Sequence, residues 1–295
     1  MNGSRRRRWA LRVAALVGFV ALAGVTYQGV ATALERREFP KPGRMVDVGG
    51  HQLHLDCVGE GAPIVVLDAP AAGASAAWGR VQPAVAGFTR VCSYDRAGLG
   101  WSEAREQPFG PALAVDELQH LLAGANEKGP FVLVGQGLGA ALVQAFAAHF
   151  PAEAAGLVLV DAPAAGKTGT GSALLVRFPR LTPWLARVGI LRGFKLHDWL
   201  VDGLPDPSRG ALATFLNRPD HLTRSALELV RWDDVVAVGA TAELPPHLPV
   251  RRVNTEATGR IAFLTGEADA ARVNAAILET VAALRAATPA VAAGR

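Results

Sequence analysis

Several residue types that would indicate metal, redox or nucleic-acid function are scarce in this chain. Its 295 residues include two cysteines, seven histidines and only four lysines. No cysteine–histidine or acidic cluster has the spacing of metal ligands, and no glycine-rich loop has a nucleotide-binding spacing. The sequence therefore predicts no bound metal and no cofactor. It also has no repeat of fixed period, which excludes a solenoid.

The positive charge of the chain is confined to one end. The formal net charge is +4 at pH 7, but Arg5, Arg6, Arg7, Arg8 and Arg12 alone contribute +5, which leaves −1 for the remainder. A nucleic-acid-binding protein carries its basic residues on the folded surface. We therefore predict no nucleic-acid partner.

An apolar run follows the arginines. Residues 13–34 contain no charged side chain, and a helix needs about 20 apolar residues to cross a bilayer. Trp9 and Tyr27 lie where interfacial aromatic residues usually lie. The run predicts a single membrane-spanning helix, and the arginines place the N-terminus in the cytoplasm with the folded domain outside, periplasmic or extracellular.

A cleaved signal peptide is the alternative interpretation of the same segment. Ala31-Thr32-Ala33 fits the small-residue pattern of a cleavage site, and cleavage near Ala33 would release a secreted protein. In the anchored alternative, residues 1–35 are a basic tail and anchor, 36–44 a linker, and 45–295 the folded domain.

Strand and helix patterns alternate from about residue 45. Two short strand-like segments flank Gly49-Gly50 and predict a hairpin. Continuous apolar runs at 63–68, 131–135 and 157–161 are typical of strands buried on both faces, and residues 76–88, 111–125 and 138–150 are expected to form helices. The alternation predicts an α/β fold with a mostly parallel sheet covered by helices on both faces.

Four strings in this order resemble the α/β-hydrolase superfamily, most closely a bacterial branch with an N-terminal membrane helix. They are VDVGGHQLHLDCVGEG, TRVCSYDRAGLGWS, PFVLVGQGLGAALVQAFAAHFP and AGLVLVDAPA. The resemblance implies the α/β-hydrolase fold with a helical lid at about residues 164–246.

The resemblance also locates the positions at which a hydrolase would carry its catalytic residues. The family's G-x-S-x-G nucleophile elbow reads Gly135-Gln136-Gly137-Leu138-Gly139, so position 137 has no nucleophile. The histidine position reads Thr258-Gly259-Arg260, and arginine stays protonated and cannot act as a base. The sequence thus predicts no catalytic residues, with Gly137 and Arg260 as degenerate positions.

The acid-bearing segment also departs from the family pattern. Only six residues, 255–260, follow the strand-like segment 248–254 before the segment that resembles the one after the histidine, whereas the family has a helix and a strand there. We therefore expect a shortened C-terminal part of the sheet. Glu256 could replace the acid, but it is more simply a solvated loop carboxylate.

Backbone groups of the former site could still bind a ligand. The amides of Leu138 and of the loop 69–73 could form an oxyanion hole without a nucleophile. The predicted ligand-binding residues are Ala69, Pro70, Gln136, Gly137, Leu138 and Asp161. The predicted function is that of a non-hydrolytic pseudoenzyme that binds a small apolar ligand or a protein partner.

Two other functions remain open from the sequence. Relocated chemistry would make the protein an esterase-like hydrolase, with Ser75 or Ser93 as nucleophile and His197 or His221 as base. In the other interpretation, the sequence is degenerate and the protein has little function of its own.

Two further features follow from the resemblance. In this fold Cys57 and Cys92 would lie on neighbouring antiparallel strands, where they form either a disulfide or two buried thiols. The lid segment 174–204 mixes arginines with large apolar residues, which predicts either contact with a membrane surface or ordinary packing over a pocket.

Overall fold

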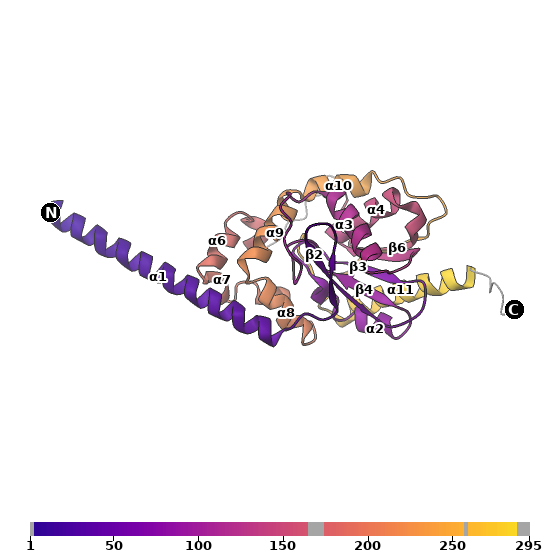
Figure 1. Ribbon diagram of the computed structural model, residues 1–295, viewed down its shortest axis with the longest axis horizontal. Helices are drawn as coiled ribbons and strands as arrows, with labels where there is room; N and C mark the ends of the chain where they lie inside the picture. Colours follow the sequence, from indigo (N-terminus) through magenta and orange to yellow (C-terminus); the bar gives the residue numbers. More distant parts are fainter. Residues whose placement is uncertain (1–2, 165–173, 257–258, 288–295) are drawn as a thin grey trace.

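The computed structural model describes residues 3–164, 174–256 and 259–287 (Figure 1). Its centre is a seven-stranded sheet with the order β1-β2-β4-β3-β5-β6-β7. The strands are β1 (Arg44–Asp47), β2 (Gln52–Val58), β3 (Val65–Asp68), β4 (Val91–Tyr94), β5 (Phe131–Gln136), β6 (Ala154–Val160) and β7 (Val250–Val253).

The sheet is parallel except at one edge. β1 and β2 form the hairpin predicted around Gly49-Gly50, with Asp47 opposite Gln52, and β2 pairs antiparallel with β4. All other neighbouring strands pair in parallel. This topology confirms the predicted fold class.

Helices cover both faces of the sheet, as alternating side chains require (Figure 1). In β5, Phe131 and Leu133 pack with α3 (Pro111–Gly124) and α4 (Leu138–His149) on one face. Val132 and Val134 pack with α2 (Gln82–Ala86) and α11 (Glu267–Ala287) on the other. Burial of both faces explains the continuous apolar runs in the sequence.

The helix expected at residues 76–88 forms as two short pieces. A 3₁₀ turn covers Ser75–Trp78, and α2 covers only Gln82–Ala86. Pro83 explains the break, because proline is tolerated in the first turn of a helix but not in its interior.

The last strand leaves a polar edge. β7 is mostly exposed and carries Arg251 and Arg252, which discourage pairing with another chain. Among the described residues no further strand lies between β7 and α11. The sheet is therefore shortened at this end, as expected.

A helical insertion separates β6 from β7. It contains the helices α5 (Leu174–Arg177), α6 (Thr182–Arg187), α7 (Ile190–Gly193), α8 (Ser208–Phe215), α9 (Pro219–Val230) and α10 (Trp232–Ala240) and a 3₁₀ turn at Asp198–Leu200. It falls inside the range expected for a lid, of which residues 165–173 lie outside the described part.

The N-terminal helix α1 (Gly3–Glu38) extends away from the domain at one end and lies along the helical insertion at the other (Figure 1). Residues 5–38 are long and apolar enough to cross a membrane, and their most apolar part is exposed. The helix is compatible with a membrane anchor or with a signal sequence.

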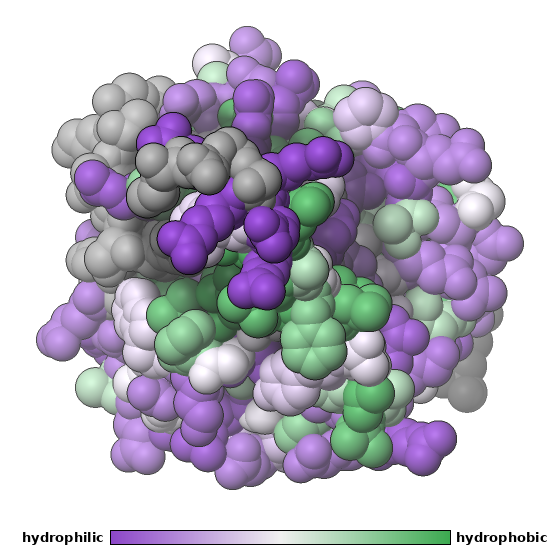
Figure 2. All heavy atoms as spheres, turned by 90° about the vertical axis from the view of Figure 1, so that its left-hand side faces the viewer, coloured by the Kyte–Doolittle hydropathy of each residue, from purple (hydrophilic) through white to green (hydrophobic). Residues whose placement is uncertain are grey.

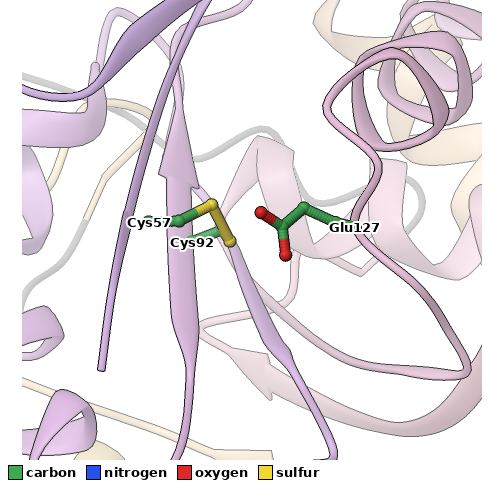
Figure 3. Close-up of side chains that lie close together, drawn as sticks. All are labelled: Cys57, Cys92 and Glu127. Carbon is green, nitrogen blue, oxygen red and sulfur yellow. A yellow bond between two sulfur atoms is a disulfide. The ribbon is translucent and has the colours of Figure 1, made fainter. Parts of the chain in front are cut away.

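The two cysteines are joined across β2 and β4 (Figure 3). Cys57 and Cys92 are directly opposite each other in the register of the two strands. Glu127 lies close to both sulfur atoms, as in a metal site. Disulfide sulfurs are not thiolate ligands, however, and the Glu127 carboxylate is paired with Arg90 at 2.7 Å, so these three residues do not form a metal site.

Candidate functional site

The turn between β5 and α4 keeps an unusual backbone at position 137. Gly137 has φ 54° and ψ −115°, a combination that side-chain-bearing residues rarely adopt. A Cβ at Gly135 would overlap the carbonyl oxygen of Gly139, and one at Gly139 would overlap the carbonyl oxygen of Asp68. The flanking glycines are thus required by the close approach of strand and helix.

The central position of this turn has room for a side chain. A Cβ at Gly137 would meet only Pro70, at 3.6 Å, and the residue is half-buried. The fold therefore presents a place for a side chain that the sequence does not supply.

The loop after β3 faces this turn and is held by a buried guanidinium. Nη1 of Arg96 donates to the carbonyl oxygen of Ala69 at 2.7 Å, and Nη2 donates to that of Pro70 at 2.9 Å. Pro70 has no N–H, so it cannot contribute an amide to an oxyanion hole.

A carboxylate from the helical insertion occupies the next part of the same loop. Glu228 of α9 is fully buried, and its Oε2 accepts the Ala72 amide at 3.1 Å. Its Oε1 accepts Nε of Arg96 at 2.7 Å. One loop amide that could stabilise an anion is therefore already bound to an anion of the protein itself.

Burial and neighbouring charges together set the ionisation of Asp68 and Arg96 in this cluster. Burial raises the pKa of Asp68, which also accepts a hydrogen bond from the Tyr94 hydroxyl at 2.9 Å. Burial opposes the charge on Arg96, but Glu228 and then Asp68 outweigh it and raise its pKa. The guanidinium stays charged and links the loop to the insertion.

Ala72 is held from two sides by α9. It has a positive φ of 58°, which is uncommon for a residue with a Cβ. His221 Nε2 donates to its carbonyl oxygen at 3.0 Å, while Glu228 accepts its amide. The two side chains are seven residues apart and so share one helix face. This spacing is present in the sequence, but it did not identify the pair as part of the site.

The remaining predicted ligand residues are mostly occupied by contacts within the protein. The Asp161 carboxylate accepts the amide and hydroxyl of Thr255, at 2.7 and 2.6 Å. Leu138 and Ala69 are buried in the core. Gln136 is buried, and its Nε2 has no hydrogen-bond partner among the described residues.

Arg260 lies against the helical insertion. Its guanidinium is stacked over the Trp232 ring at 5.4 Å. The neighbouring Thr258 lies outside the described residues.

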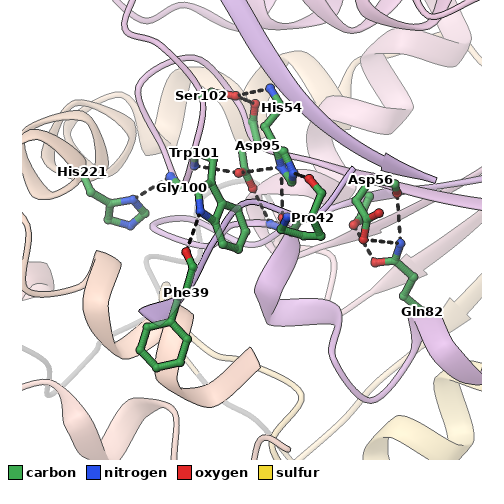
Figure 4. Close-up of polar contacts among 12 residues, drawn as sticks. Phe39, Pro42, His54, Asp56, Gln82, Asp95, Gly100, Trp101, Ser102 and His221 are labelled. Atoms are coloured by element: carbon green, nitrogen blue, oxygen red, sulfur yellow. Dashed lines mark hydrogen bonds and ion pairs between the residues drawn. The ribbon is translucent and has the colours of Figure 1, made fainter. Parts of the chain in front are cut away.

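Sequence reasoning missed a buried histidine, His54, which lies between Asp95 and Pro42 (Figure 4) and beside Ser75. His54 Nδ1 is 3.0 Å from Oδ2 of Asp95 and 3.5 Å from the Ser75 hydroxyl oxygen. Asp95 also accepts the backbone amides of Ser75 at 2.6 Å and Trp101 at 2.9 Å. The chain thus brings a serine, a histidine and an aspartate together away from position 137.

The atoms in this group are not arranged for proton transfer from serine. Ser75 and Asp95 both contact Nδ1 of His54, whereas Nε2 lies 2.6 Å from the Pro42 carbonyl oxygen. A catalytic histidine uses one nitrogen for the acid and the other for the nucleophile. Burial lowers the pKa of His54, but the Asp95 carboxylate outweighs it and raises the pKa. Both ring nitrogens face oxygen acceptors, the Asp95 carboxylate and the Pro42 carbonyl group, so both act as donors.

The other candidates for relocated chemistry are also separated from one another. Ser93 donates to the Gln82 side chain at 2.6 Å. His221 Nδ1 accepts the Gly100 amide at 3.0 Å, and His197 Nδ1 donates to the Leu216 carbonyl oxygen at 3.0 Å. Neither histidine is near the two predicted serine nucleophiles in any described contact.

A cavity of the described residues lies on the β2 side of the domain. It has a volume of about 600 Å³, with apolar walls from Phe39, Trp101, Ala86 and Ala211. Asp56, Ser75, Gln82 and Ser93 form a polar part of its lining. None of the six predicted ligand-binding residues lines it.

Comparison with known proteins agrees with this architecture. The sequence pattern of the Alpha/beta hydrolase family matches residues 61–294. A putative lipase of Acinetobacter baumannii superposes with a TM-score of 0.63 at 17% identity, covering 88% of this chain and 97% of its own. An enol-lactonase of Burkholderia xenovorans gives 0.55 at 17% identity, covering 82% and 100%.

Curated relatives match over a shorter part of the chain. A 2-hydroxy-6-oxo-2,4-heptadienoate hydrolase of Pseudomonas putida is 37% identical over 125 residues, which are 41% of this chain and 44% of that protein. An uncharacterized protein of Schizosaccharomyces pombe is 37% identical over 115 residues, or 39% and 22%. The chain thus matches less than half the length of either relative.

The backbone of Gly137 generates a stability prediction. We expect Gly137→Ala to lower the free energy of unfolding by about 1–3 kcal/mol, because a Cβ is strained at this φ although it has space. Gly87→Ala is the matched control, since the φ of Gly87 is −69° and a Cβ there would meet only the Ala84 carbonyl oxygen, at an ordinary 3.7 Å. Denaturant unfolding measures both, and equal stabilities would contradict the strained turn.

The buried His221 generates a pH prediction. Burial, and then Arg218, lowers its pKa to about 4, so the folded state keeps it neutral while the unfolded chain binds a proton below about pH 6.5. The free energy of unfolding should therefore fall as pH drops from about 6.5 to about 4, by on the order of 3 kcal/mol.

His221→Gln removes this titration while keeping a donor and an acceptor. Denaturant unfolding at several pH values should show a smaller loss in His221→Gln than in the wild type. If the free energy of unfolding depended on pH in the same way in both proteins, a neutral buried His221 would be contradicted.

Proposed function

Because the chain belongs to the Alpha/beta hydrolase family, we propose that it keeps the family's fold as a membrane-anchored pseudoenzyme that binds a small apolar ligand without hydrolysing it. The Gly137 turn carries this proposal. The elbow backbone is present, but its central residue has neither a hydroxyl nor a thiol to attack a carbonyl.

The contacts around the turn support the same conclusion. A tetrahedral oxyanion needs free amide donors, yet the Ala72 amide already binds Glu228. A negative charge at this place would also lie near the buried Glu228 carboxylate. The helical insertion acts in this proposal as a lid that stays closed over the former catalytic position.

The cavity beside Trp101 is the proposed ligand site. Its volume of about 600 Å³ is in the range of small-molecule sites, and its walls are mainly apolar with a few polar groups. Ser93 and Gln82 bond each other, and Gln82 donates to Asp56, so the polar lining satisfies much of its own hydrogen bonding. An apolar ligand therefore fits better than a strongly polar one; a protein partner is the alternative.

The anchor is the second part of the proposal. Residues 1–35 form the cytoplasmic tail and the spanning helix, 36–44 the linker, and 45–295 a domain outside the membrane. The exposed apolar side chains of α1 and the arginines at its start support this orientation. Phe39, Pro40 and Pro42 of the linker line the cavity, so the anchor and the ligand site are adjacent in the chain.

One observation favours the alternative of an esterase-like hydrolase. Ser75 lines the cavity and lies next to the His54–Asp95 pair. Rotation of the His54 ring away from Pro42 would be needed before Nε2 could accept the serine proton.

The first test is ester hydrolysis. Full-length protein should show no turnover of p-nitrophenyl butyrate above a blank and no labelling by a fluorophosphonate. Gly137→Ser should stay inactive too, because no histidine contacts that position. Labelling that disappears in Ser75→Ala would establish the hydrolase alternative, and activity gained in Gly137→Ser would contradict the loss of the base.

The second test concerns the cavity. Ala86 lines it and Ala84 of the same helix is exposed and does not. The ¹⁹F signal of 4-fluorobenzyl alcohol should broaden with wild-type protein in nanodiscs beyond an empty-nanodisc blank. Ala86→Phe should abolish the excess broadening and Ala84→Phe should keep it. An equal effect of the two variants would contradict this site.

A further inference from the structure

The length of α1 that is free of the domain is too short to cross a bilayer. The side chains of residues 9–20 are exposed, whereas Gly24 is in close backbone contact with the helical insertion. The free apolar part, Trp9 to Val20, is 12 residues or about 18 Å long, against a hydrocarbon core of about 30 Å.

The contact between α1 and the insertion is tight and specific. A Cβ at Gly24 would overlap the Val188 carbonyl oxygen, so the two backbones touch. Gln28 is buried; its Nε2 donates to the Asn217 carbonyl oxygen at 2.7 Å, and its Oε1 accepts Nε of Arg192 at 3.0 Å. Arg192 also pairs with Glu35. Separation of the insertion from α1 would therefore break two hydrogen bonds of Gln28 and the ion pair of Arg192.

Membrane crossing then requires part of the insertion to enter the lipid. A 20-residue span that starts directly after the arginine cluster runs from Trp9 to Gln28, and one that starts at Val13 runs to Thr32. The contact at Gly24 lies four to eight residues inside these ends, about 6–12 Å below the outer boundary of the hydrocarbon. Tilting of the helix would increase this depth.

The surface of the insertion near this contact has the composition of an interfacial segment. Seven large apolar side chains between residues 178 and 199 are exposed, half of all such side chains outside α1 among the described residues. They are Phe178, Leu181, Trp184, Ile190, Phe194, Leu196 and Trp199. Figure 2 views the molecule from the side to which α1 points, and apolar residues gather near the centre of that face, below the hydrophilic residues in front.

The charges on the same segment match an anionic lipid surface. Arg177, Arg180, Arg187 and Lys195 are exposed, and the one acidic side chain between residues 174 and 199 is the half-buried Asp198. The Arg187 guanidinium lies over the Trp184 ring at 4.9 Å. Basic residues beside large aromatic and aliphatic ones are typical of helices that lie 5–10 Å deep in the headgroup region.

We propose that α6 and α7 of the helical insertion are embedded in the outer leaflet, so that the protein is held by a spanning helix and by an interfacial apolar surface together. This inference rests on the proposed anchoring by α1. The exposed apolar surface of the insertion then contacts the lipid bilayer. The insertion is thereby fixed between the membrane and the rest of the domain.

The test uses the full chain, reconstituted in phosphatidylglycerol-containing liposomes with doxyl-labelled lipids. Single cysteines in the variants Trp184→Cys, Val17→Cys and Ala275→Cys carry the fluorophore NBD; the native cysteines are bonded to each other and do not react. Val17 reports on the anchor, and Ala275 is an exposed control on α11 at the far side of the domain (Figure 1).

We expect blue-shifted emission and several-fold stronger quenching at positions 184 and 17 than at position 275. Quenching at 17 with a solvent-like signal at 184 would overturn the embedded insertion and leave the anchor intact. A solvent-like signal at 17 would overturn the anchor and, with it, this inference.

Discussion

The buried guanidinium of Arg96 connects the parts of the molecule that define the candidate site. It contacts Asp68 at the end of β3, the two carbonyl groups of the following loop, and Glu228 of α9. Breaking a buried pair by removing one partner typically costs roughly 3–5 kcal/mol, because the other charge is left unpaired. The loop after β3 and the helical insertion are therefore held in one arrangement.

This arrangement also limits the space and the donors around the turn between β5 and α4. In an acyl-transfer enzyme the space above the elbow must admit a carbonyl group and offer amide donors to it. Here Pro70 borders the Gly137 position and Glu228 and His221 bind the backbone of Ala72 from both sides. The chain keeps the elbow because it is the connection between β5 and α4, which the packing of Gly135 and Gly139 maintains without any catalytic residue.

The N-terminal helix is part of the same structure rather than a loose tether. Its second half packs on the insertion through Gly24, Gln28 and Glu35, and the linker that follows forms a wall of the cavity. The helical insertion thus contacts α1 at one end, and α4 and the loop after β3 at the other. Any ligand in the cavity would lie beside the linker that follows α1.

The sequence by itself determined the fold class, the hairpin, the shortened sheet edge and the missing side chain at position 137. These features depend on local patterns of apolar residues, glycines and chain length, which are readable along the chain. The sequence did not reveal the His54–Asp95 pair, the Glu228–Ala72 contact or the cavity beside Trp101. The two contacts join residues at least 40 positions apart, and the cavity is a space between such residues. Only the tertiary structure decides which distant polar groups form hydrogen bonds with one another when they are buried.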